Sequence, residues 1–114
     1  MANYRIYLGV DIQSNLAVSL EVEGQGSYDL IVSESTNGRD LCRFRCSDQD
    51  LNGIVENNAL ELSSQDGRCN VRSTGDVIAF EFRRKDSGEA STCALSANSF
   101  NRVVRLARNR AFVG

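Results

Sequence analysis

Most of the chain alternates apolar and polar residues with a period of two, the pattern of β-strands that bury one face. The first run places one apolar residue at every second position: Tyr4, Ile6, Leu8, Val10 and Ile12. Similar runs cover residues 16–22, 28–32, 42–46, 60–62, 69–71, 78–82 and 93–95. The pattern therefore predicts about seven to eight short strands.

Turn signals separate these runs, and Asn37-Gly38, Asp66-Gly67 and Thr74-Gly75 are the clearest of them. Consecutive strands at such short spacing favour an antiparallel meander, arranged as a sandwich or a partly closed barrel. Residues 47–53 are rich in Asp, Asn and Gln, and Asp and Asn side chains bond to nearby backbone, so we expect a loop there.

The period changes near the C-terminus. Five apolar residues follow the spacing of one helix face: Phe100, Val103, Val104, Ala107 and Ala111. We predict one C-terminal amphipathic helix over about 97–110, with Ser96 as its N-cap. It follows a β region over 3–95, so residues 1–114 form a single domain of mainly β (α+β) class without an internal sequence repeat.

Composition excludes several kinds of chemistry. The 114 residues contain no His, which removes the commonest general base and a common metal ligand. We expect no enzyme activity, no cofactor and no metal. No apolar run approaches the ~18 residues of a membrane span, and the N-terminus lacks a signal-peptide pattern. A cytoplasmic protein without membrane association is expected.

Four cysteines are present: Cys42, Cys46, Cys69 and Cys93. Without a secretion signal, reduced and buried thiols are expected. On one strand Cys42 and Cys46 lie ~13 Å apart, too far to share a zinc ion or a disulfide. If the thiols are oxidised, two pairing schemes remain open: 42–69 with 46–93, or 42–93 with 46–69.

The segment Asp48-Gln49-Asp50-Leu51-Asn52-Gly53 has the oxygen side chains and the glycine that begin a calcium-binding loop. The position that should supply a bidentate acid is Ala59, and the nearest acid is Glu61. A solvated turn is therefore the favoured interpretation, and a weak calcium site is the alternative.

Charge is distributed unevenly along a chain of net charge −2. Residues 1–97 hold all fifteen acids and nine bases, a net charge of −6, whereas residues 98–114 hold four Arg and no acid. Because His, a metal-ligand set, a phosphate loop and a membrane segment are all missing from the sequence, the remaining class is a small protein-binding module, such as a stoichiometric inhibitor or immunity-type protein. Its acidic β region would occlude a basic partner cleft. Its expected contact residues are Asp48, Asp50 and Glu56.

The predicted C-terminal helix offers a second partner surface. Leu106 falls off the apolar stripe and lies beside Arg102 and Arg110, the composition of an interface anchor. The expected contact residues of this surface are Arg102, Arg105 and Leu106. We expect a protein partner, and the sequence leaves open both its identity and the oligomeric state of this chain. Packing of Leu106 on the edge of the sheet is the alternative.

Three other functions remain open. Nucleic acid or another polyanion could bind outward-facing arginines: Arg43, Arg45, Arg68, Arg72, Arg102 and Arg105. A β-barrel could enclose a small molecule near Tyr4, Tyr28 or Cys93. Unpaired sheet edges could make the chain a self-assembling structural subunit.

Overall fold

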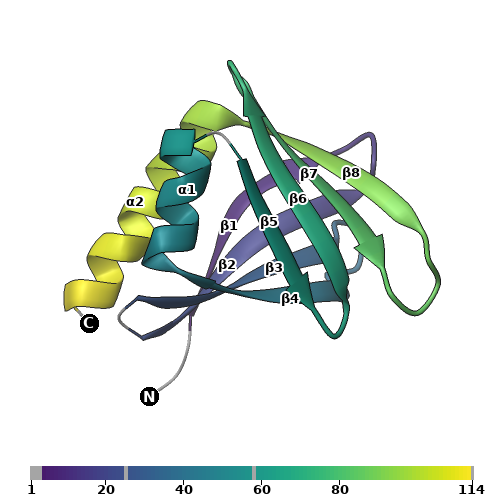
Figure 1. The fold of residues 1–114 in the computed structure, drawn as a ribbon, viewed down its shortest axis with the longest axis horizontal. Helices are drawn as coiled ribbons and strands as arrows, with labels where there is room; N and C mark the ends of the chain where they lie inside the picture. The colour runs from purple at the N-terminus through teal and green to yellow at the C-terminus, as the bar shows by residue number, and fades with distance from the viewer. Residues whose placement is uncertain (1–3, 25, 58, 114) are drawn as a thin grey trace.

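The fold is a two-sheet β-structure with both helices at one end (Figure 1). The computed structural model describes residues 4–24, 26–57 and 59–113, and leaves out the side chains of residues 4, 24, 55, 57 and 107–113. Its elements are β1 (Tyr4–Asp11), β2 (Leu16–Gly24), β3 (Ser27–Glu34), β4 (Asp40–Ser47), α1 (Asp48–Asn57), β5 (Ala59–Ser64), β6 (Gly67–Thr74), β7 (Val77–Arg84), β8 (Ala90–Ser96) and α2 (Ala97–Val113). The predicted eight-strand antiparallel meander and the C-terminal helix are confirmed.

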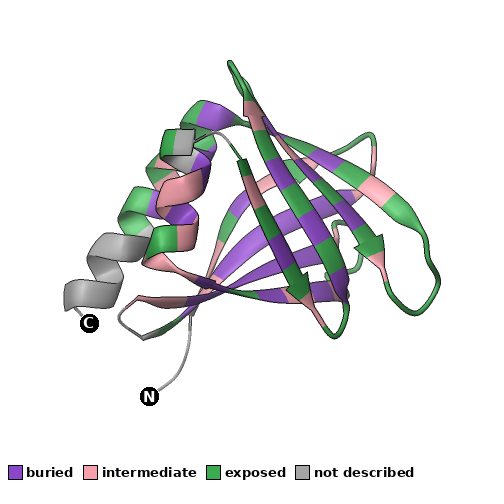
Figure 2. Cartoon of the chain, viewed as in Figure 1, coloured by how far each residue is buried: buried purple, intermediate pink, exposed green. Residues whose placement is uncertain are grey.

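The strands form two four-stranded sheets, each with its strands in sequence order. Sheet A contains β1 to β4, and sheet B contains β5 to β8. Buried and exposed residues alternate along most of the strands of sheet B (Figure 2). The inward side chains of both sheets make one apolar core, in which Phe80 of β7 contacts Phe100 of α2 with ring centroids 5.7 Å apart.

A β-bulge in β1 changes which residues face the core. Tyr7 pairs with Ser19 but Gly9 pairs with Val18, so Leu8 is an extra residue and the alternation shifts by one. Leu8 is buried, whereas Val10 is 54% exposed and Ile12 89% exposed. The prediction that Val10 and Ile12 continue the buried face was therefore wrong, because periodicity alone carries no signal for the bulge.

The predicted loop over residues 47–53 was also wrong, since most of it forms helix α1. Ser47 and Asp50 cap this helix reciprocally: the Asp50 N–H donates to Ser47 Oγ at 3.2 Å and the Ser47 N–H donates to Asp50 Oδ2 at 2.9 Å. Leu51 and Ile54 then project into the core. The helical backbone also removes the basis for a calcium loop at Asp48–Gly53.

Four strands followed by a helix occur twice in the chain. The turns before β4 and β8 match: Gly38 and Gly88 both have φ near 71°, and each donates its N–H to a carbonyl four residues earlier. The helices are exchanged, because α1 packs against β5 and β6 of sheet B while α2 packs against β1 and β2 of sheet A. This repeat was not visible in the sequence.

No helix among the described residues is long and apolar enough to cross a membrane.

Candidate functional site

Two of the three acidic residues predicted to contact a partner are engaged within the fold. Asp48 accepts a hydrogen bond from the hydroxyl of buried Tyr28 at 2.8 Å. Asp50 accepts the capping bond from the Ser47 backbone described above. Glu56 is exposed near the end of α1. The structure therefore assigns Asp48 and Asp50 intramolecular roles and leaves Glu56 on the surface.

The predicted residues of α2 lie on its outer side. Arg102 and Arg105 are exposed, and Leu106 is 52% exposed. Neither arginine forms an ion pair with any residue whose side chain the structure describes. Arg108 and Arg110 lie outside the described side chains.

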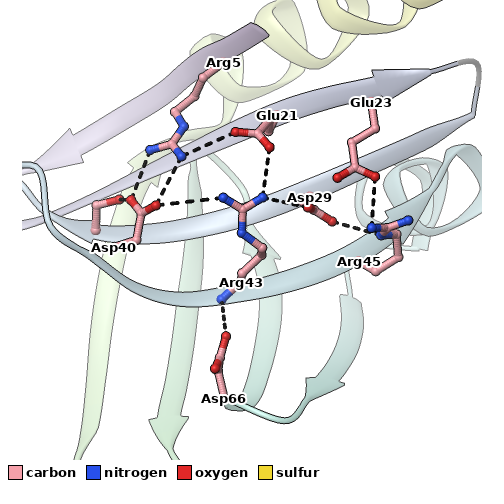
Figure 3. A network of polar contacts seen from close by, with 9 residues as sticks. Arg5, Glu21, Glu23, Asp29, Asp40, Arg43, Arg45 and Asp66 are labelled. Carbon is pink, nitrogen blue, oxygen red and sulfur yellow. Dashed lines mark hydrogen bonds and ion pairs between the residues drawn. The ribbon is translucent and has the colours of Figure 1, made fainter. Parts of the chain in front are cut away.

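The outward arginines of sheet A are neutralised by an ion-pair network (Figure 3). Arg43 Nη1 lies 2.9 Å from Glu21 Oε1 and 2.8 Å from Asp29 Oδ2. Arg45 bonds the other oxygen of Asp29 at 3.0 Å and also pairs with Glu23 at 2.9 Å. These carboxylates balance the positive charges of Arg43 and Arg45, so this face offers little net positive charge to a polyanion.

Arg5 extends the network across β1. Its guanidinium binds both oxygens of Asp40, at 3.0 and 3.1 Å, and reaches Glu21 at 3.4 Å. The hydrogen bond from Arg5 lowers the pKa of Asp40, and the hydrogen bond from Arg43 lowers the pKa of Glu21. Both carboxylates are therefore held in the charged form, as expected for structural ion pairs.

Three carboxylates of this network approach one another closely. Single oxygens of Glu21, Glu23 and Asp29 lie within 4.8 Å of one another, the only such convergence of possible metal ligands in the described part of the chain. A hydrogen bond with Asp29 raises the pKa of Glu23. The guanidinium groups of Arg43 and Arg45 already lie against these oxygens, so the protein's own arginines supply the cations that balance the cluster.

All four cysteines are free and buried. Burial raises the pKa of Cys46, Cys69 and Cys93 to about 12. Such thiols remain protonated at neutral pH and are poor nucleophiles. Tyr28 and Cys93, proposed for a barrel ligand site, are fully buried in the apolar core, and Tyr4 lies outside the described side chains.

The outward face of sheet B has a different charge pattern. Arg68, Arg72 and Arg83 are exposed on it and form no ion pair with any described side chain. Arg68 lies directly opposite Arg83 in the antiparallel register of β6 and β7. Like charges directly opposite each other destabilise a sheet, so this pair is costly unless an anion lies nearby.

A basic hollow adjoins this pair at one end of sheet B. It has a volume of about 470 Å³ and is lined by Ser63, Ser64, Gly67, Arg68, Arg83, Arg84, Lys85 and Gly88. No acidic residue lines it. Arg84 pairs with Asp86 at 3.0 Å, whereas the nearby Asp66 directs its carboxylate to the Arg43 backbone N–H at 3.1 Å. The hollow therefore keeps an excess of positive charge.

Local backbone geometry brings the basic residues of the hollow together. Gly67 has φ near 154°, and a Cβ at this position would lie 2.1 Å from the Arg83 carbonyl oxygen. Only glycine allows β6 to begin this close to β7. The Lys85 N–H donates to the Asp66 carbonyl at 2.9 Å, and Arg83 Nη1 donates to the Gly88 carbonyl at 3.3 Å.

Sequence reasoning identified Arg68 and Arg72 but missed Arg83, Arg84 and Lys85. The available signal was the run of three consecutive bases that precedes the turn at Gly88. Alternation predicts that neighbouring residues such as Arg83 and Arg84 face opposite sides of a sheet. It does not predict that both residues line one hollow at the end of the sheet.

Comparison of the chain with protein-family models, curated proteins and solved structures finds no match in any of the three.

Proposed function

We propose that this protein binds nucleic acid through the outward face of sheet B, with Arg68, Arg72 and Arg83 contacting the phosphate backbone. The observation that carries the proposal is the contrast between the sheets. The arginines of sheet A are each held by carboxylates, whereas Arg68, Arg72 and Arg83 on the outward face of sheet B pair with none among the described side chains. Phosphate is the anion for which the planar guanidinium is best suited.

The spacing of the basic residues suits an extended strand. Arg68 and Arg72 lie four residues apart on β6, which places their Cα atoms ~13 Å apart along the face. Between them lies a row of exposed polar residues in register, Glu61, Asn70 and Glu81. Amide and carboxylate side chains can bond the edges of unpaired bases, while the flanking arginines hold phosphates.

The proposal is tested by titrating a labelled single-stranded oligonucleotide at increasing salt. The expected result is an affinity that falls steeply with salt, because phosphate contacts release counterions. Arg68→Gln combined with Arg72→Gln should reduce the slope of log K against log salt by about 1.4, since each phosphate contact with a single strand contributes about 0.7. Arg39→Gln is the control, because Arg39 is exposed on the turn between β3 and β4. Absence of binding, or equal slopes in both variants, would reject the proposal.

A second candidate is the protein-binding module expected from the sequence. The observation in its favour is the exposure of Leu106, at 52%, beside Arg102 and Arg105. A stoichiometric inhibitor that uses this surface should recover one partner in a nuclease-treated pull-down washed with salt. Leu106→Ser should abolish the recovery, and Val77→Ser, a change at an apolar residue 40% exposed on sheet B, should not. Equal recovery with both variants would reject this candidate.

A further inference from the structure

We infer that the basic hollow at the end of sheet B binds a phosphate monoester, either the terminal phosphate of a nucleic-acid strand or that of a free nucleotide. The strand-end form of this inference rests on the proposed function, and the nucleotide form stands without it. Three properties of the hollow support this inference: its positive charge, its hydrogen-bond donors and its volume.

Charge favours a dianion. Four cationic side chains line the hollow, from Arg68, Arg83, Arg84 and Lys85, and Asp86 is the only described carboxylate paired with any of them. A phosphate monoester carries about −1.5 to −2 at pH 7, whereas an internal phosphodiester carries one negative charge. The terminal group therefore gains more from this concentration of positive charge than a phosphate within a strand.

Hydrogen-bond donors remain available around the hollow. Arg83 uses one N–H on the Gly88 carbonyl, which fixes the guanidinium and leaves four of its five N–H groups for a ligand. Ser63 adds an exposed hydroxyl from β5. A phosphate monoester offers three terminal oxygens as acceptors, so it can be held from two strands at once.

The volume of the hollow leaves room for more than a phosphate group. A water molecule takes ~30 Å³ of liquid, so about 470 Å³ far exceeds what a single phosphate group fills. It lies within the usual range for small-ligand sites. No aromatic residue lines it, so a nucleoside would fit without base stacking. Recognition should therefore depend on the phosphate and show little preference among bases.

The test compares three oligonucleotides of one sequence, with a 5′-phosphate, a 3′-phosphate or no terminal phosphate, together with a free nucleoside monophosphate. One phosphorylated form should bind about tenfold more tightly than the unphosphorylated strand, as expected for an added charged hydrogen bond. Arg83→Gln combined with Lys85→Gln should remove this difference. Arg72→Gln, on the same sheet but outside the hollow, should weaken all three strands equally.

The outcomes separate this inference from the proposed function. Equal affinity of the wild-type protein for all three strands, with no nucleotide binding, would overturn the inference and leave the proposed function intact. Binding of the nucleotide alone, lost in the Arg83→Gln, Lys85→Gln variant, would support the inference and reject nucleic-acid binding. If neither strands nor nucleotide bind, both are rejected.

Discussion

Arg43 and Arg68 both lie on the outward face of a sheet, and their surroundings give them different roles. Arg43 bonds Glu21 and Asp29, and hydrogen bonds to these carboxylates raise its pKa. Arg68 lies opposite another arginine, Arg83. A guanidinium held by carboxylates stabilises the fold, whereas two facing guanidiniums favour an external anion.

The ion pairs of sheet A should make stability depend on pH. Arg43 lowers the pKa of Glu21 and Arg5 lowers that of Asp40. A carboxyl whose folded pKa is depressed stabilises the fold above its unfolded pKa, about 4, and this contribution is lost as pH falls through the folded value. Urea denaturation should therefore show the free energy of unfolding falling from about pH 5 to about pH 3.

Substitution of one partner tests this assignment. In Arg43→Gln the fall of unfolding free energy with decreasing pH should be shallower, because Glu21 loses its main partner. Arg39→Gln is the control, since Arg39 lies 3.9 Å from Glu34 in an exposed turn. This substitution should leave the pH dependence of the wild-type protein unchanged. An Arg43→Gln profile as steep as that of the wild-type protein would contradict the network's role.

Gly67 should tolerate no side chain. A Cβ there would lie 2.1 Å from the Arg83 carbonyl, whereas a Cβ on Gly75 would meet no atom within 4 Å. Gly75→Ala should lower the free energy of unfolding by about 1 kcal/mol, the cost of a positive φ. Gly67→Ala should cost more than about 3 kcal/mol, because backbone must move. Equal costs in urea denaturation would show that β6 and β7 separate easily at this end.

Among the helices and strands, α1 begins at a capping pair formed by Ser47 and Asp50. The Ser-x-x-Asp pattern resembles a capping box, and both of its hydrogen bonds form. Ser47→Ala should lower the free energy of unfolding by about 1 kcal/mol. Ser96→Ala should cost less, because the equivalent bond of α2 is single and long, at 3.5 Å. A larger loss for Ser96→Ala would contradict this ranking.

The sequence was sufficient to predict most strands and α2. The strands alternate over several residue pairs, and the helical spacing of α2 continues over several turns. It was insufficient where one residue changes the register, as Leu8 does in β1. It also missed α1, whose apolar face is carried by only a few residues, such as Leu51 and Ile54. The Asp and Asn residues around them favour turns as readily as helix starts.

Part of the candidate site was predictable as well. Alternation predicted correctly that Arg43, Arg45, Arg68 and Arg72 face outward. Which of them are neutralised depends on carboxylates from neighbouring strands of the sheet, such as Asp29 of β3 beside Arg43. Pairing across a sheet requires the register, and the register became known only with the structure.

At the scale of the whole molecule, the repeated order of four strands and a helix makes the two sheets equivalent in topology but not in charge. Each helix packs against strands of the opposite half, so the two halves share one core. The outward face of sheet A carries the ion-pair network (Figure 3), whereas Arg68, Arg72 and Arg83 are exposed on the outward face of sheet B. The proposed binding of nucleic acid therefore uses only one of the two related faces.

The most direct test of this assignment is a titration of the isotopically labelled protein with a single-stranded oligonucleotide, followed by backbone amide chemical shifts. We expect shifts to change along β5, β6 and β7, centred on Arg68, Arg72 and Arg83, while the amides of Arg43 and Arg45 stay unchanged. Changes centred on sheet A or on α2, or no changes at all, would contradict this assignment.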